Sequence, residues 1–358
     1  MKRLILVALA LVIWVNAAVA ENEPEEVLAP YFCLVDAADL KTLLRGREED
    51  VRAAPGSTTK IMTCLLTLEH CGLDTVVRVP PEALGLSKSM TRMGLQRGER
   101  YTVRELLYGL MLVSGNDAAI ALAVHISGSV AEFAVLMNEK AEQLGLADTH
   151  FVNPHGLYAE EHYTTARDMA VLTAYALKNE AFREIVGTAL YEIPATSRHA
   201  STFRLKNTNK LIAAAADAPL YYPHAIGVKT GSTPRGGMAL VSAAEKDGVT
   251  LICVMMGLMG SDDDASYRSN RRFSDAIMLF EQEFEWRAAL PAATAGNSPL
   301  SAALTSPLEE GGARPTPWTT PEEEPMEKAT DRFRSVANII FVVALTVLVC
   351  TLVWRKRG

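Results

Sequence analysis

The 358-residue sequence has few cysteines, no excess of basic residues and no repeat of solenoid length, and each absence removes a class of protein. Its five cysteines are scattered and form no Cys-x-x-Cys pair, which excludes a disulfide framework and a cysteine-based zinc site. Cys64 and Cys71 are two helical turns apart, too far for a disulfide if one helix contains both. The formal net charge of −7 shows no excess of Lys and Arg that would attract the phosphates of a nucleic acid, so we expect no nucleic-acid partner.

The N-terminus has the pattern of a secretory signal peptide. Lys2 and Arg3 precede an uninterrupted apolar run over residues 4–15, and small residues follow at 18–20. The apolar run is short for a membrane span. We therefore expect residues 1–20 to be removed on export rather than kept as an anchor.

Near the other end, residues 336–354 carry no charge and would extend about 28 Å as a helix, close to the thickness of the hydrocarbon core. We expect a transmembrane helix here, with 355–358 as a cytoplasmic tail. Basic residues flank both ends and do not set its direction, but an exported N-terminus places the body outside the membrane. Residues 288–335, rich in Pro, Thr, Ala, Gly and Glu, predict an extended linker.

The body between these segments, residues 25–287, mixes strand and helix patterns. Alternation at 31–46 predicts a hairpin, and Thr102 with Glu105 forms a capping box ahead of a long stretch of helical periodicity. Short apolar runs separated by turns over 225–258 predict further strands before a final helix. A sheet fed from both ends of the body, with helices grouped between, predicts an α+β fold with a mainly antiparallel sheet.

Three short motifs carry candidate chemistry. Ser57 and Lys60 stand three residues apart at the start of a helix-like run, where a hydroxyl and an amine share one face. Alone, this spacing also fits an N-cap serine and a solvated lysine. A Ser-Gly-Asn tripeptide at 114–116 lies between two predicted helices. A Lys-Thr-Gly tripeptide at 229–231 ends a predicted strand whose glycines leave room for another backbone.

Each motif occurs once, in an order and on element types that penicillin-interacting serine enzymes require. With the flanking segments "PGSTTKIMT", "LVSGNDAA", "FVNPHGL", "HYTTARDMA", "NTNKL" and "GVKTGST", the chain resembles the low-molecular-weight D-alanyl-D-alanine carboxypeptidases of peptidase family S11 over nearly all of 31–286. The resemblance implies a serine β-lactamase/DD-peptidase (transpeptidase-like) fold, an antiparallel sheet beside a helical lobe. It also implies removal of the terminal D-alanine from peptidoglycan stem peptides ending in D-Ala-D-Ala, covalent inhibition by β-lactam antibiotics and no cofactor.

The same resemblance implies a role for each motif residue. Ser57 is expected to be the acylated nucleophile and Lys60 its base, with Ser114 and Asn116 on the facing wall. The residues expected on the strand side, where the terminal carboxylate of the substrate binds, are Lys229, Thr230, Gly231, Ser232 and Arg272.

Two further assignments follow from the resemblance. The backbone amides of Ser57 and Ser232 are expected to form the oxyanion hole. Arg272 matches a family arginine near the carboxylate. Because Arg268 and Arg271 are close to it in the sequence, the resemblance does not decide which of the three arginines corresponds to the family residue.

Elementary electrostatics favours these roles independently. Lys60 acts as a base only when neutral, and both a helix dipole and the nearby Lys229 disfavour its charged form, so we expect a lowered pKa. A peptide entering beside residues 225–232 would pair as an extra strand and place its terminal amide over Ser57.

Three other functions share part of these features. A β-lactamase needs a deacylating group, for which Glu160 and Glu161 are candidates by position only, while the flanking segments favour the S11 family. A penicillin-sensing protein with a vestigial site is disfavoured because the motif residues are intact. A metallopeptidase would use residues whose spacings match no zinc motif: His150, His155, His162 and Asp168. The sequence leaves open whether the enzyme trims stem peptides or cleaves cross-links.

Overall fold

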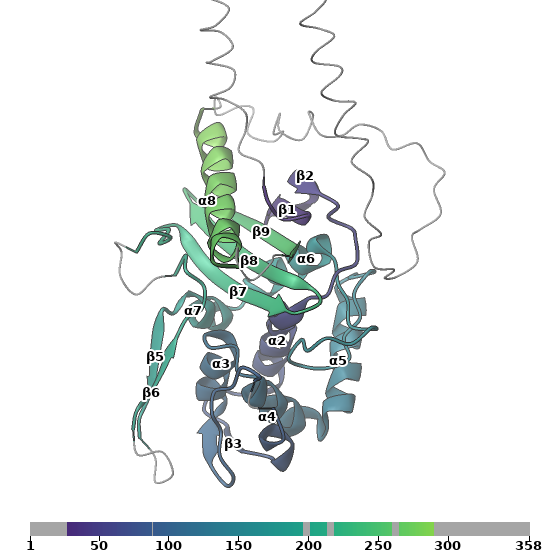
Figure 1. Ribbon diagram of the computed structural model, residues 1–358, viewed down its shortest axis with the longest axis vertical. Helices are drawn as coiled ribbons and strands as arrows, with labels where there is room; N and C mark the ends of the chain where they lie inside the picture. Colours follow the sequence, from purple (N-terminus) through teal and green to yellow (C-terminus); the bar gives the residue numbers. More distant parts are fainter. Residues whose placement is uncertain (1–26, 88, 196–200, 213–217, 260–264, 290–358) are drawn as a thin grey trace, which may run out of the picture. The chain divides into compact units, whose positions relative to one another are not determined.

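The computed structural model describes residues 27–87, 89–195, 201–212, 218–259 and 265–289 (Figure 1). The predicted signal peptide, transmembrane helix and cytoplasmic tail lie outside these ranges, and so does the predicted linker beyond Ala289. The last helix of the body extends to Ala289, so it includes the first two residues assigned to the linker.

One antiparallel sheet of five strands joins the two ends of the described body, as predicted. Its strand order is β2-β1-β9-β8-β7, which leaves β7 at an edge. The hairpins predicted around 31–46 and 225–258 are both confirmed, and Asp247 and Gly248 with positive φ form the two-residue turn between the last two strands. The strands are β1 (Tyr31–Asp36), β2 (Asp39–Arg47), β7 (Ala225–Thr233), β8 (Gly237–Lys246) and β9 (Val249–Leu258).

The two faces of this sheet bury alternate residues, because side chains alternate along a strand. Along β9, Leu251 and Cys253 pack with the last helix, α8 (Ala265–Ala289). The intervening Ile252 and Val254 belong to the larger core beneath the opposite face. The sheet therefore lies between α8 and a lobe of helices (Figure 1).

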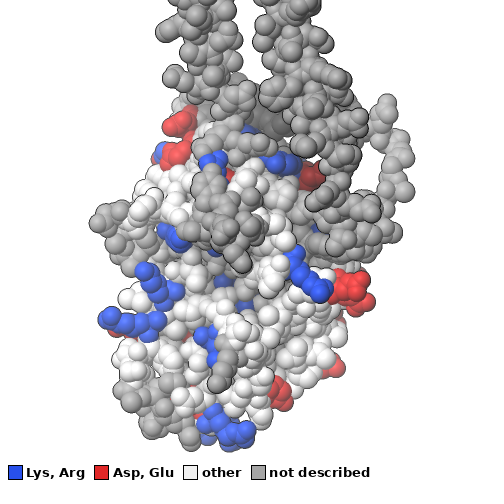
Figure 2. Space-filling view, in the orientation of Figure 1, with Lys and Arg blue, Asp and Glu red and all other residues white. Residues whose placement is uncertain are grey.

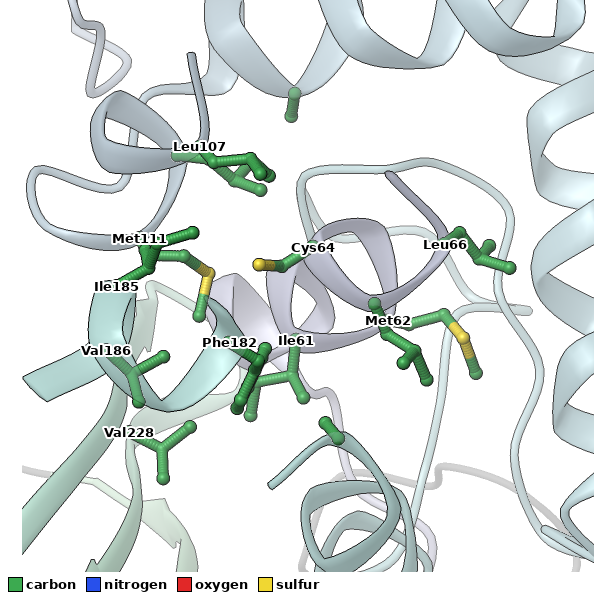
Figure 3. Packing of buried hydrophobic residues seen from close by; sticks show 14 of the residues in the cluster. Ile61, Met62, Cys64, Leu66, Leu107, Met111, Phe182, Ile185, Val186 and Val228 are labelled. Carbon is green, nitrogen blue, oxygen red and sulfur yellow. The ribbon is translucent and has the colours of Figure 1, made fainter. Parts of the chain in front are cut away.

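The helical lobe is built around α2, whose first eight residues, 60–67, are all buried. Its apolar side chains meet those of α3 and α7, including Leu107 and Phe182, and Val228 of β7 lies near Val186 of α7 in the same core (Figure 3). The capping box of Thr102 and Glu105 is present at the start of α3. The helices are η1 (Gly56–Thr59), α2 (Lys60–His70), α3 (Val103–Met111), α4 (Asn116–Ser127), α5 (Val130–Gln143), α6 (Ala166–Ala176) and α7 (Glu180–Gly187).

The start of α2 differs in detail from the sequence prediction. Ser57 lies in the short 3-10 turn η1, and the α-helix proper begins at Lys60. The helix ends at His70, so Cys71 follows it in an extended conformation, and Cys64 and Cys71 are both free thiols.

Two small antiparallel ribbons and one short turn complete the described elements. They are β3 (Val76–Arg78) with β4 (Arg100–Thr102), β5 (Leu190–Ile193) with β6 (Phe203–Lys206), and η2 (Pro81–Leu84).

Among the described helices, none alone has the length and hydropathy of a membrane span, and α4 with α5 passes that test only as a pair bent by 83°. Figure 2 shows the Lys and Arg side chains of one face in small separate groups rather than in one continuous basic patch.

Candidate active site

Ser57 lies where η1, the edge strand β7 and the loop after His155 converge. The loop approaches so closely that a Cβ atom placed on Gly156 would lie 1.7 Å from the carbonyl oxygen of Gly56. Gly156 also has a φ of +85°, a conformation that favours glycine. Only a glycine therefore allows this approach, which brings the backbone of His155 next to the start of α2.

Lys60 is the polar centre of the site. Its Nζ lies 3.1 Å from the hydroxyl oxygen of Ser57 and donates to Oδ1 of Asn116 at 2.7 Å and to the carbonyl oxygen of His155 at 2.6 Å. The structure thus brings together the serine, lysine and asparagine of two separate motifs. The carbonyl group of His155 was not anticipated from the sequence.

The amine of Lys60 is completely buried. Burial lowers its pKa well below the usual value, and the nearby charge of Lys229 lowers the pKa further, while Asp117 opposes them. The expected direction of the shift is confirmed. Its main cause is removal from water, whereas the sequence argument invoked the helix dipole and Lys229.

Ser114 and Asn116 occupy the loop and the first residue of α4, as predicted. Ser114 has a φ of +60°, which is rare for a residue with a side chain. Its hydroxyl is buried and has no hydrogen-bond partner among the described residues. A strained residue with an unsatisfied hydroxyl is typical of a position that binds a ligand.

Asp117 fixes the segment that lies against this loop. One of its carboxylate oxygens accepts from the amide of Met93 at 2.7 Å, and the other accepts from Gly94 at 2.7 Å and Leu95 at 3.0 Å. The backbone amide of Asn116 donates to the carbonyl oxygen of the nearby Thr91 at 3.0 Å. These bonds hold the 91–95 segment against the start of α4.

The strand side of the site is formed by the end of β7. A Cβ atom on Gly231 would lie 3.2 Å from the carbonyl oxygen of Pro55, and one on Gly56 would lie 3.5 Å from the backbone nitrogen of Ser232. The end of β7 therefore packs directly against the turn that carries Ser57. The backbone amide of Ser232 therefore lies beside Gly56, the residue before Ser57.

Lys229 is buried rather than open to solvent. Only 1% of its surface is exposed, and its Nζ donates to the carbonyl oxygen of Thr230 at 3.0 Å. Burial, followed by repulsion from Arg272, lowers the pKa of Lys229 to about 7. Charge on Lys229 near neutral pH therefore responds to what binds beside it.

Arg272 is the arginine that reaches this strand. Its Nη1 donates to the carbonyl oxygens of Gly231 at 3.0 Å and Ala239 at 2.8 Å, and burial lowers its pKa to about 10. Arg271 instead pairs with Asp275, and the side chain of Arg268 lies outside the described residues. These contacts distinguish Arg272 from Arg271 and show it bracing β7 and β8.

The histidines considered for a metal site have other partners. The amide of Val152 donates to Nδ1 of His162 at 3.0 Å, so the proton is on Nε2, which donates to the hydroxyl of Thr59 at 2.8 Å. His150 Nδ1 lies 2.6 Å from the carbonyl oxygen of Glu161. Within the described ranges, no group of three or more His, Cys, Asp or Glu residues is arranged to hold a metal ion.

Burial also sets the state of the two inner histidines. It lowers the pKa of His155 to about 3 and that of His162 to about 4, with Lys60 contributing to both shifts. Both rings are therefore neutral at physiological pH. The carboxylates of Glu160 and Glu161, considered as deacylating groups, are exposed.

One contact of the site was missed in the sequence. The hydroxyl of Thr208 lies 2.8 Å from that of Thr230, and the amide of Thr208 donates to the carbonyl oxygen of Leu112 at 3.0 Å. Thr208 thus connects the strand side with the segment before Ser114. The "NTNKL" segment supported the family resemblance, but its spacing gave no sign of this contact.

Comparison with known proteins agrees with this geometry. Residues 17–260 match the family model described as D-alanyl-D-alanine carboxypeptidase, peptidase S11. The D-alanyl-D-alanine carboxypeptidase DacF of Bacillus subtilis is 39% identical over 224 residues, covering 61% of this chain and 55% of that protein. The D-alanyl-D-alanine carboxypeptidase of a Streptomyces species is 36% identical over 256 residues, covering 68% and 83%.

Solved structures show the same similarity. The crystal structure of the Streptomyces K15 DD-transpeptidase superposes with a TM-score of 0.64 and 33% identity, covering 73% of this chain and 98% of that one. A D-alanyl-D-alanine carboxypeptidase from Mycobacterium tuberculosis gives a TM-score of 0.62 at 30% identity, covering 74% and 92%. The predicted combination of antiparallel sheet and helical lobe is therefore confirmed.

Proposed function

The chain belongs to the D-alanyl-D-alanine carboxypeptidase family of serine peptidases, S11, and from that premise we propose that it removes the terminal D-alanine from peptidoglycan stem peptides through an acyl-enzyme on Ser57. The observation that carries the proposal is the environment of Lys60. A buried amine with a lowered pKa lies 3.1 Å from the hydroxyl of Ser57. This is the arrangement of a nucleophile and its base.

The contacts of Lys60 explain how the amine takes a proton. A neutral amine has two N–H groups and one lone pair. The carbonyl oxygens of Asn116 and His155 accept the two N–H groups at 2.7 and 2.6 Å, which leaves the lone pair for the hydroxyl of Ser57. Oγ then attacks the carbonyl carbon of the terminal peptide bond while its proton moves to Nζ.

The backbone on either side of Ser57 is assigned to the developing oxyanion. The amides of Ser57 and Ser232 belong to segments that pack against each other, and both are held by rigid elements, η1 and β7. Donors fixed before the reaction stabilise a tetrahedral intermediate without reorganisation. The C–N bond then breaks, and the proton passes to the amine of the departing D-alanine.

Ser114 is assigned to this second proton transfer. Its buried hydroxyl has no partner among the described residues, so the hydroxyl is available to the leaving amine. A water molecule afterwards attacks the ester on Ser57, and Lys60 again takes and returns a proton. Hydrolysis frees the shortened peptide and restores the serine hydroxyl.

Recognition of the terminal carboxylate is assigned to Thr230 and Lys229. A carboxylate next to Lys229 favours its charged form, and the pKa of about 7 means that binding promotes uptake of a proton near neutral pH. Arg272 is assigned a positioning role, because its guanidinium donates to carbonyl oxygens of β7 and β8. It also adds positive potential behind the carboxylate.

Penicillin labelling of the full-length chain tests the proposal. A labelled penicillin is expected to form a stable adduct on Ser57, and purified stem pentapeptides are expected to lose one D-alanine. A Ser57→Ala variant that still labels, or an adduct mapped to another residue, would contradict the assignment. Fast release of hydrolysed penicillin would instead indicate a β-lactamase.

The proposed location of this activity is the outer side of a membrane. It is supported by the signal-like residues 1–20 and the charge-free run at 336–354, both outside the described residues. Protease added to intact spheroplasts should remove the body and leave a short membrane fragment. A body protected from protease in intact spheroplasts and digested only after their lysis would contradict this location.

A further inference from the structure

Two exposed side chains meet beside Ser57 and have no part in the mechanism above. The guanidinium carbon of Arg235, in the turn between β7 and β8, lies 5.0 Å from the centre of the Tyr158 ring. Tyr158 belongs to the loop that follows His155. Both side chains are exposed, and no carboxylate in the described part of the chain forms an ion pair with Arg235.

The position of this pair is fixed by two close backbone approaches. Gly156, two residues before Tyr158, packs against the carbonyl oxygen of Gly56. Gly236, next to Arg235, is so close to Ala54 that a Cβ atom on it would lie 2.7 Å from the Cβ of Ala54. The loop and the turn therefore flank the segment that leads into Ser57.

The direction of a bound peptide follows from the order of groups along β7. Its last residue lies toward Lys229 and Thr230, which are assigned to the carboxylate, and its reacting carbonyl lies at Ser232. The preceding residues must continue past Ser232 toward Arg235. Ser232 and Arg235 are three residues apart, with Thr233 the last residue of β7 and Arg235 in the turn that follows it.

We propose that Arg235 and Tyr158 form a subsite that binds a carboxylate on the residue preceding the D-alanyl-D-alanine pair of the substrate. The inference rests on the proposed function, because it takes its direction from the assigned site of the carboxylate. A guanidinium binds a carboxylate through two parallel hydrogen bonds. The ring of Tyr158 supports the guanidinium from one side by a cation–π contact, which leaves its edge for the ligand.

Two short peptides test this specificity on the full-length chain. N-acetyl-L-Glu-D-Ala-D-Ala and N-acetyl-L-Gln-D-Ala-D-Ala differ in one carboxylate, so the ratio of their kcat/KM values measures its recognition. Because Arg235 is exposed, we expect a preference of about fivefold for the glutamate peptide, the upper end for a surface ion pair. The ratio should approach one in Arg235→Gln and fall below one in Arg235→Glu.

A matched variant separates the subsite from net charge. Arg78 is an exposed arginine on β3, and Arg78→Gln should keep the preference of the unchanged protein. A ratio that Arg235→Gln leaves unchanged, or that Arg78→Gln lowers equally, would overturn the subsite. Failure of the unchanged protein to cleave either peptide would overturn the proposed function, whereas equal cleavage of both peptides would overturn the subsite alone.

Discussion

The hydroxyl of Thr208 lies 2.8 Å from the hydroxyl of Thr230, while the amide of Thr208 donates to the carbonyl oxygen of Leu112 at 3.0 Å. One residue therefore contacts both sides of the site. If Thr230 donates its proton to the substrate carboxylate, Thr208 must be the donor within the pair, because each hydroxyl has a single proton. Thr208 would then fix the direction in which Thr230 donates.

Replacing Thr208 with valine keeps its shape and removes this donor. We expect kcat/KM for a peptide with a free terminal carboxylate to fall about five- to tenfold, the loss of one hydrogen bond to a charged acceptor through its partner. A small activated ester without the carboxylate should be affected much less. Thr208→Ser keeps the hydroxyl and should retain the activity. Equal losses for both substrates in Thr208→Val would indicate a purely structural role.

The two lysines should differ in substrate and pH dependence. Lys60→Ala should reduce acylation by every substrate about 10²- to 10⁴-fold, because the general base is lost. Lys229→Met should mainly impair substrates with a carboxylate. With the uncharged ester, the acid limb of the pH–rate profile of Lys229→Met should move to higher pH, because a positive neighbour that lowers the pKa of Lys60 has been removed. Lys229→Arg retains a charge and is the control. An acid limb that stays in place, or moves to lower pH, would contradict the coupling.

Gly156 is expected to be essential for the site because of space rather than backbone strain. Gly156→Ala places a Cβ atom against the carbonyl of Gly56 and should displace the His155 carbonyl from Lys60. We expect penicillin acylation to slow about 100-fold, the typical effect of a displacement of about 1 Å in a catalytic site. Gly145 also has a positive φ, of +71°, but no atom lies within 4 Å of its Cβ position. Gly145→Ala should therefore lose stability, by about 1–2 kcal/mol, and keep its acylation rate.

The two buried histidines should make the fold sensitive to mild acid. Their pKa values of about 3 and 4 lie below the ordinary value of 6.5, so the unfolded chain binds more protons as the pH falls below that value. The free energy of unfolding should therefore decrease from pH 6.5 toward pH 4, by about 1.4 kcal/mol per pH unit for each histidine.

Urea unfolding across this pH range checks the sign. His155→Gln and His162→Gln should each make the decrease shallower. His125→Gln, at an exposed position in α4, should leave the slope unchanged. A variant at His155 or His162 with the slope of the unchanged protein would show that this ring is not held neutral by the fold.

The sequence by itself determined the elements that depend on local patterns. The strands at 225–258 and the capping box of Thr102 and Glu105 follow from alternation, turn residues and cap chemistry, which act over a few residues. The spacing of Ser57 and Lys60 likewise required only the geometry of one turn. The segments at 1–20 and 336–354 remain predictions.

Only the tertiary structure decided how the lysines ionise and which distant groups they meet. Lys60 contacts Asn116 and the carbonyl of His155, which are 56 and 95 residues away in the chain. Its pKa is set mainly by removal from water, and no sequence pattern reports how completely folding excludes water from one atom. For the same reason the contact of Arg272 with β7, and that of Arg235 with Tyr158, became visible only once separate segments were packed together.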